Sequence, residues 1–332
     1  MQKTKYNMQA GMTLVELMIA LLIGLLLSAA IITVYISNKN TFWETEEAAS
    51  MQDNALFAKR LIQDEIWLAE YHGENAANID TLDYSALPDL TNDCGPANVK
   101  ELDKLPSVFA IHYQKGMVDL PECLADKHVK DKTDVLFIKR VALDAPAGPL
   151  KAKKIYFKPL AQDTGAVYRG TKNFGDMDDA ASAYTEGGTG NSALREFIYR
   201  VYYIYKPDGV VFPQLRRMSL RINVNSYEWF VESVAEGIAD IHYQFGLDTS
   251  AVPNRQVNTY VTANILSTGD WSDVHAVKMF MLTQSTRKDM DYEDDKTYSY
   301  RGTDNPGVLG GHYHRKLQQT TFMIPNNIPP GT

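Results

Sequence analysis

The chain has 332 residues, of which 45% are hydrophobic and 22% are charged. This is the composition of a folded protein, and it excludes wholesale disorder, a collagen-like repeat and a pure coiled coil. The 33 Lys and Arg residues are outnumbered by 41 Asp and Glu, which gives a formal net charge of −8. Because an acidic chain is a poor electrostatic partner for phosphate backbones, we expect no nucleic acid among its partners.

A long apolar segment lies near the N-terminus. No residue from Leu17 to Ile36 is charged, and a helix of this length spans roughly 30 Å, the thickness of a bilayer's hydrocarbon core. The preceding residues include Lys3 and Lys5 and no acid, which places the N-terminus in the cytoplasm by the positive-inside rule. The alternatives are a buried helix of a soluble protein and a secretory signal peptide, whose apolar core is shorter.

The junction between the basic leader and the apolar segment reads Gly11-Met12-Thr13-Leu14-Val15-Glu16. This sequence resembles the signal of type IV prepilins. In that family a prepilin peptidase cuts before the apolar helix, on its cytoplasmic side, and methylates the new N-terminus. The resemblance implies cleavage between Gly11 and Met12, N-methylation of Met12, and Glu16 as the fifth mature residue. The chain departs from the family at Met12, where Phe is commonest, and at Thr33, where many major pilins have Pro.

Glu16 is an ionisable residue at the start of the apolar segment, and such residues are functional candidates because a charge there is costly. Cleavage would create an α-ammonium at Met12, which is equally costly to leave unpaired in a medium of low dielectric constant. A carboxylate in one subunit can pair with the N-terminus of its neighbour. We therefore interpret Glu16 as an assembly residue; the alternative is a side chain that merely reaches the lipid headgroups.

The helix is predicted to continue beyond the membrane, because no proline interrupts residues 37–72 and Gly73 is a plausible stop. Small and apolar residues recur there at steps of three and four, namely Ala48, Met51, Ala55, Ala58, Ile62, Ile66 and Ala69. We expect a leader at 1–11, a transmembrane and filament-core helix at 12–36, an amphipathic continuation at 37–72, and a β-rich globular domain at 73–332.

Cys94 and Cys123 are the two cysteines of the chain. Beyond the inner membrane of a Gram-negative cell the compartment is oxidising, so an even pair predicts a disulfide. The alternative is a metal site that also uses His112 and His128, but it would need more ligands nearby. We expect a disulfide, no metal and no cofactor.

Strand-like segments rich in β-branched and aromatic residues dominate the rest of the chain. They are Ser107–Tyr113, Asp134–Leu143, Lys154–Lys158, Glu196–Tyr205, Leu215–Val224, Glu228–Val234, Ile238–Gly246, Val274–Thr283 and Leu317–Ile324. Residues 161–194 and 284–312 are polar and are predicted to be long surface loops. Since residues 73–332 exceed what one small pilin sheet needs, we expect two sheets.

Three C-terminal segments resemble the PilW-like minor pilins of type IV pili. They are Val234–Gly246, which contains Glu-Gly-Ile-Ala-Asp, then Trp271–Leu282, and finally His314–Asn327. A segment related to the first occurs in the J pseudopilin of type II secretion. The middle of the chain, about 74–195, carries no such resemblance.

Other polar clusters are weak candidates for chemistry. The acidic run Asp289–Asp295 could offer oxygen ligands to Ca²⁺, but it lacks the spacing of an EF-hand loop, and a solvated loop is the simpler interpretation. Asp176–Asp179 is interpreted in the same way. His312 and His314 are interpreted as the polar edge of a strand, and Gly187–Asn191 as a flexible tip. No catalytic motif is evident, so we expect no enzyme.

Together these features predict a pilin-like α+β fold, with a long N-terminal helix packed by its outer half on antiparallel sheets. The resemblance implies a minor pilin that primes a type IV pilus and sits at its tip. Its partners would be other minor pilins, the major pilin, the prepilin peptidase and a tip adhesin. It would span the inner membrane once before assembly and then enter the pilus. The alternatives are a type II secretion pseudopilin and, from another class, a signal-anchored periplasmic enzyme or binding protein.

Overall fold

The computed structural model describes residues 11–71, 81–83, 94, 107–117, 120–125, 127–146, 150–161, 164–170, 194–209, 212–223, 226–250, 254–263, 266, 270–299 and 307–325. The chain divides into two compact units, Met1–Ser50 and Met51–Thr332. The leader before Gly11 and the two predicted surface features Asp176–Asp179 and Gly187–Asn191 lie outside the described residues.

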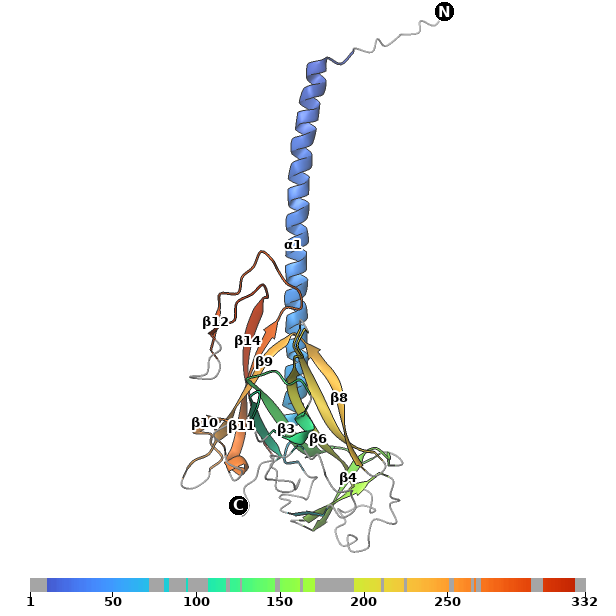
Figure 1. Cartoon of the computed structure of the whole chain (residues 1–332), viewed down its shortest axis with the longest axis vertical. Helices are drawn as coiled ribbons and strands as arrows, with labels where there is room; N and C mark the ends of the chain where they lie inside the picture. The colour runs from blue at the N-terminus through green and yellow to red at the C-terminus, as the bar shows by residue number, and fades with distance from the viewer. Residues whose placement is uncertain are drawn as a thin grey trace, which may run out of the picture. The chain divides into compact units, whose positions relative to one another are not determined.

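A single α-helix, α1, runs from Leu14 to Trp67 (Figure 1). The prediction that it extends to residue 72 is wrong. The chain turns at residues 68–70, and Glu70 has a φ of 61°, in the left-handed region that a helix cannot contain. The Glu70 carboxylate then accepts the backbone N–H of Ser107 at 3.2 Å. This contact with a distant segment ties down the turn at the helix end.

The first half of α1 is long and apolar enough to cross a membrane. Its large apolar side chains between Met12 and Ile36 are exposed, as a surface that faces lipid or neighbouring subunits requires.

The second half of α1 is amphipathic, as predicted. Five residues of the predicted stripe are fully buried, namely Ala55, Ala58, Ile62, Ile66 and Ala69. The stripe begins later than expected, because Ala48 is exposed and Met51 is only half-buried. The small alanines let the helix backbone lie close to the sheet it covers.

The larger sheet has eight strands. They are β1 (Thr81–Asp83), β2 (Val108–Tyr113), β3 (Thr133–Val141), β4 (Ile155–Ala161), β5 (Thr164–Arg169), β6 (Arg195–Tyr205), β7 (Gln214–Asn223) and β8 (Ser226–Glu236). The order is β1-β5-β4-β6-β3-β2, and β6 also pairs with β7, which pairs with β8. All these pairs are antiparallel except β1 with β5.

The second sheet has four antiparallel strands in the order β10-β9-β11-β14. They are β9 (Ile238–Leu247), β10 (Thr259–Thr262), β11 (Val274–Gln284) and β14 (Arg315–Met323). A third pair joins β12 (Thr297–Tyr298) to β13 (Gly307–Val308). Short 3₁₀ turns occupy Glu122–Leu124 and Asp270–Asp273. The α+β fold with antiparallel sheets is thus confirmed.

Two loop predictions and one strand prediction need correction. Residues 161–194 contain β5, which pairs with β4, and residues 284–312 contain β12 and β13. His312 and His314 precede β14 instead of lying on it. Each of these strands pairs with a neighbour close along the chain, but its polar composition gave no strand pattern to predict it from.

One apolar core joins the second half of α1 to both sheets. Strand β9 of the second sheet packs against β3 and β6 of the first, around the C-terminal part of the helix (Figure 1). Trp271 fills the junction, with its ring edge-on to Phe245 at 4.6 Å and to Phe109 at 6.2 Å between centroids. These three aromatic residues come from separate segments and hold the two sheets together.

Gly237 forms the sharp connection between β8 and β9. Its φ is +72°, and an added Cβ would lie 2.5 Å from the carbonyl oxygen of Gln284. The Gly237 carbonyl also accepts the backbone N–H of Gln284 at 2.7 Å. Only glycine suits both the conformation and the close approach. This explains the glycine in the C-terminal segment that resembles PilW-like pilins.

Candidate functional site

The predicted processing and assembly residues gather at the start of α1. Gly11 and Met12 precede the helix and are exposed, and an added Cβ on Gly11 would meet no atom within 4 Å. The peptide bond between them therefore lies outside the helix, which begins at Leu14. Glu16 lies in the first helical turn.

Glu16 closes a capping box with Thr13. Its Oε2 accepts the Thr13 backbone N–H at 2.9 Å and the Thr13 hydroxyl at 3.0 Å, while the Glu16 N–H donates to Thr13 Oγ1 at 3.3 Å. This reciprocal arrangement satisfies backbone donors that a helix start leaves unpaired. This role of Thr13 was not among the predictions, although the Thr-x-x-Glu pattern before an apolar run indicates it. Glu16 thus starts the helix as well as carrying a charge.

The structure joins Cys94 to Cys123 in a disulfide with a Cα–Cα distance of 5.0 Å. Both residues are buried. The metal site considered for them with His112 and His128 does not form, because the two sulfurs are bonded to each other. His128 instead lies edge-on to the ring of Tyr205. A closed loop of this size stabilises a fold by roughly 3.5 kcal/mol in the chain-entropy model.

A buried charge cluster attaches the second half of α1 to the larger sheet. The Glu65 carboxylate accepts Nε of Arg140 at 2.6 Å and Nη2 at 3.3 Å, and it also pairs with Nη1 of Arg200. The two arginines lie on the neighbouring strands β3 and β6. Burial alone would raise the pKa of Glu65, but the two guanidinium groups outweigh that effect and lower it. Glu65 was not predicted as a functional residue, because a charged residue inside an apolar stripe carries no periodic signal.

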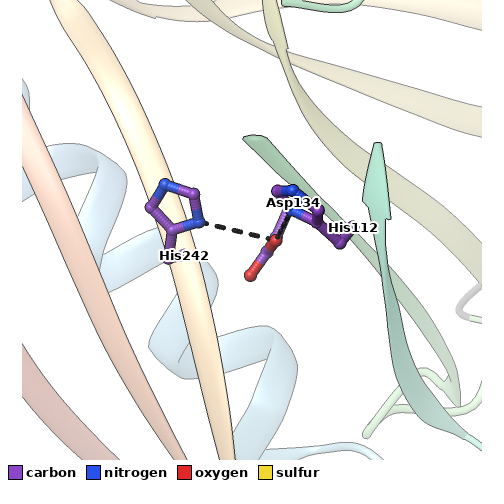
Figure 2. A group of neighbouring side chains, drawn as sticks. All are labelled: His112, Asp134 and His242. Atoms are coloured by element: carbon purple, nitrogen blue, oxygen red, sulfur yellow. Dashed lines mark hydrogen bonds and ion pairs between the residues drawn. The ribbon is translucent and has the colours of Figure 1, made fainter. Parts of the chain in front are cut away.

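Three side chains that could ligate a metal meet between the two sheets: His112 on β2, Asp134 on β3 and His242 on β9 (Figure 2). Asp134 Oδ1 lies 2.8 Å from Nδ1 of His112 and 3.5 Å from Nδ1 of His242. The side chains expose 7%, 0% and 4% of their surfaces, respectively. Oδ1 of Asp134 thus faces Nδ1 of His112 and Nδ1 of His242, and all three side chains are almost completely shielded from solvent.

A second layer of groups surrounds these three. The other oxygen of Asp134 accepts the backbone N–H of Tyr243 at 2.8 Å. On its far side, His242 presents Nε2 to Asp240 Oδ1 at 3.3 Å, and Lys130 Nζ lies 3.2 Å from Asp240 Oδ2. Burial opposes ionisation of Asp134, but hydrogen bonds from His112 and His242 hold its pKa at about 2. Burial likewise opposes charge on His242, and the two carboxylates raise its pKa despite that.

The acidic run at residues 289–295 is not wholly solvated, which corrects the prediction. Asp294 is buried and accepts Nη1 of Arg315 at 2.6 Å and the hydroxyl of Tyr298 at 3.0 Å. These donors occupy the carboxylate that a calcium ion would use. His314 pairs with Asp289 at 3.0 Å. The run therefore anchors the segment before β14.

Two family models match the chain. The model described as Type IV Pilus-assembly protein W, PilW, matches residues 201–326, and the Prokaryotic N-terminal methylation motif matches residues 6–32. Neither a curated protein nor a solved structure matches the chain. The shorter match contains Gly11, Met12 and Glu16. The longer match covers the second sheet, and it includes His242 but neither His112 nor Asp134.

Proposed function

We propose that this chain, which belongs to the PilW family of type IV pilins, primes assembly of the pilus and sits at its tip. It is a membrane-anchored minor pilin that is later assembled into the pilus, so other pilins and the pilus machinery are its partners. The two matches point to a structural pilin. We place the specific partners among sibling minor pilins, the major pilin, the prepilin peptidase and a tip adhesin.

The observation that carries this proposal is the order of features along one chain. A methylation motif opens a helix long and apolar enough to cross a membrane, and a PilW region ends the chain. The helix supplies an apolar surface for a filament core, and the sheets supply a separate surface for neighbours. Processing between Gly11 and Met12, methylation of Met12 and the division of the chain at residues 11 and 36 belong to the same proposal.

The proposed position at the tip rests on the size of the folded part after α1 and on the helical symmetry of a filament. A helical filament grows through heterologous contacts, in which each subunit offers one surface above and its complement below. The part of the chain after α1 forms an eight-stranded and a four-stranded sheet with an additional strand pair. Such a body obstructs tight repetition around a thin filament. A tip has no subunit above it, so the bulk is tolerated there, and a few copies suffice to start assembly.

Deleting the protein should lower the number of pili more than their length, since initiation suffers before elongation. Electron microscopy of sheared and cell-bound pili measures both quantities. Immunogold labelling of the native protein should mark one end of each pilus. Labelling along the whole shaft, or a normal number of pili in the deletion strain, would contradict the proposal. Normal pili together with a loss of protein secretion would favour the type II pseudopilin alternative.

Loss of the Glu16 charge should reduce incorporation into pili while leaving cleavage intact, because the N-terminal ammonium of a neighbouring subunit would lose its partner. Glu16→Gln is the informative variant, since glutamine can replace glutamate in the capping box but carries no charge. Thr13→Ala is the matched control, since it removes the cap and keeps the carboxylate. Quantitative immunoblots of sheared pili should show a severalfold loss for Glu16→Gln and near-normal incorporation for Thr13→Ala. If Thr13→Ala lost incorporation and Glu16→Gln did not, the role of Glu16 would be helix capping alone.

A further inference from the structure

We propose that His112, Asp134 and His242 form a divalent-metal site that binds zinc and ties the two sheets together. The proposed ligands are Nδ1 of each histidine and Oδ1 of Asp134. They come from three strands, β2 and β3 of the larger sheet and β9 of the smaller (Figure 2). This inference is independent of the role of the protein in the pilus.

The donors lie close enough together to approach one tetrahedral ion, since one ligand atom from each residue lies within 4.8 Å of the other two. Zinc binds imidazole nitrogen at about 2.0–2.1 Å and carboxylate oxygen at about 2.0–2.2 Å, so tetrahedral ligands lie about 3.4 Å apart. His242 Nδ1 is already 3.5 Å from Asp134 Oδ1. His112 Nδ1 is closer, at 2.8 Å, and must move outward by about 0.6 Å. His112 lies on the terminal strand of the sheet order, where such a shift is least opposed.

The surrounding groups have the arrangement that metal-binding histidines need. A ligating histidine usually presents its other ring nitrogen to a carboxylate, which fixes the ring and its tautomer. His242 does so through Nε2 and Asp240, and Asp240 is held in turn by Lys130. The Tyr243 N–H occupies Oδ2 of Asp134, which leaves Oδ1 directed at both imidazoles. The second layer thus favours binding through the three proposed atoms.

The chemical type of the donor atoms points to zinc instead of calcium or magnesium. Two imidazole nitrogens and one carboxylate oxygen form a ligand set that suits zinc, whereas calcium and magnesium prefer oxygen ligands alone. Three protein ligands leave a fourth position for a water molecule. On binding through Nδ1, a neutral histidine keeps its proton on Nε2, and a histidine that starts as an imidazolium releases its Nδ1 proton to the solvent.

The role that follows is structural. β10 pairs with β9 only from Gln244 to Leu247, and Tyr243 lies just beyond that ladder. There the Asp134 carboxylate accepts the Tyr243 N–H and so connects β3 to β9. An ion held by β2, β3 and β9 would strengthen this connection, because a ligand that binds only the folded state stabilises it.

The test uses the full-length chain in detergent, stripped with a chelator and titrated with zinc alone. We expect one zinc per chain and, at a free zinc concentration of about a hundred times Kd, a rise in Tm of roughly 5 °C. Cobalt(II) should give the intense visible absorption of a four-coordinate ion, which reports the ligand geometry directly. A wild-type chain that binds no zinc, or whose cobalt spectrum is that of a six-coordinate aqua ion, would overturn the proposal.

Variants identify the ligands. His242→Gln and Asp134→Asn should each abolish the rise in Tm and the cobalt absorption. His128→Gln and His314→Gln are matched controls, since His128 is exposed and His314 pairs with Asp289 outside the cluster. Both controls should bind zinc as the wild type does. Equal zinc binding in all four variants would place the ion elsewhere and refute the assignment. Should the buried variants fail to fold, the wild-type stoichiometry and cobalt spectrum still decide the outcome.

Discussion

Gly11→Val should block removal of the leader almost completely. A side chain at this position would crowd the site of the prepilin peptidase, which must reach the bond between Gly11 and Met12. The chain itself has room for the side chain, since an added Cβ meets no atom within 4 Å. A loss of processing would therefore reflect recognition by the enzyme and not damage to the substrate. Intact-mass measurement after co-expression with the peptidase reads the result directly.

The matched control is Gly24→Ala, a second glycine near the N-terminus whose added Cβ also meets no atom within 4 Å. It should be cleaved like the wild type, losing residues 1–11 together with Lys3 and Lys5. A wild-type chain that keeps Met1, or that is cut beyond residue 30, would contradict the pilin processing proposed here. It would instead favour a simple membrane tether or a secretory signal.

Glu65→Gln should destabilise the folded chain by about 3 kcal/mol, since removing one partner of a buried ion pair leaves the other charges uncompensated. Here the uncompensated groups are Arg140 and Arg200, which expose only 11% and 22% of their side chains. Urea unfolding of the mature protein in detergent measures the difference in free energy. Asp64→Asn is the control, because Asp64 is its exposed neighbour on α1, and it should change stability by less than about 0.5 kcal/mol.

The wild type and Glu65→Gln should also differ in how their stability responds to acid. The pKa of Glu65 in the folded protein is below its ordinary value of 4.5. The stabilisation from this group is therefore fully present above about pH 4.5 and is lost as the pH falls through the lowered pKa. The gap in unfolding free energy between wild type and Glu65→Gln should narrow over that range. A gap that stays constant down to pH 3 would show that lost packing, and not lost charge, causes the defect.

Several buried polar contacts lay beyond prediction because their partners are far apart in the chain. Glu65 lies 75 residues from Arg140 and 135 from Arg200, and nothing local links them. The acidic neighbours of Asp294 predict a solvated loop. Asp294 is buried because Arg315, 21 residues later, supplies the opposite charge. A carboxylate becomes an interior residue only where the fold brings a cation to it.

Features that depend on neighbours along the chain can be predicted from the amino-acid order alone. The apolar run, the prepilin-like signal around Gly11 and Glu16, and the alanine stripe of the helix all express a local pattern or a short periodicity. Tertiary structure alone decided the meeting of His112, Asp134 and His242. It also decided the end of α1 at Trp67. These depend on strand register and on contacts between distant segments, because side chains on different strands become neighbours only after the sheets have formed.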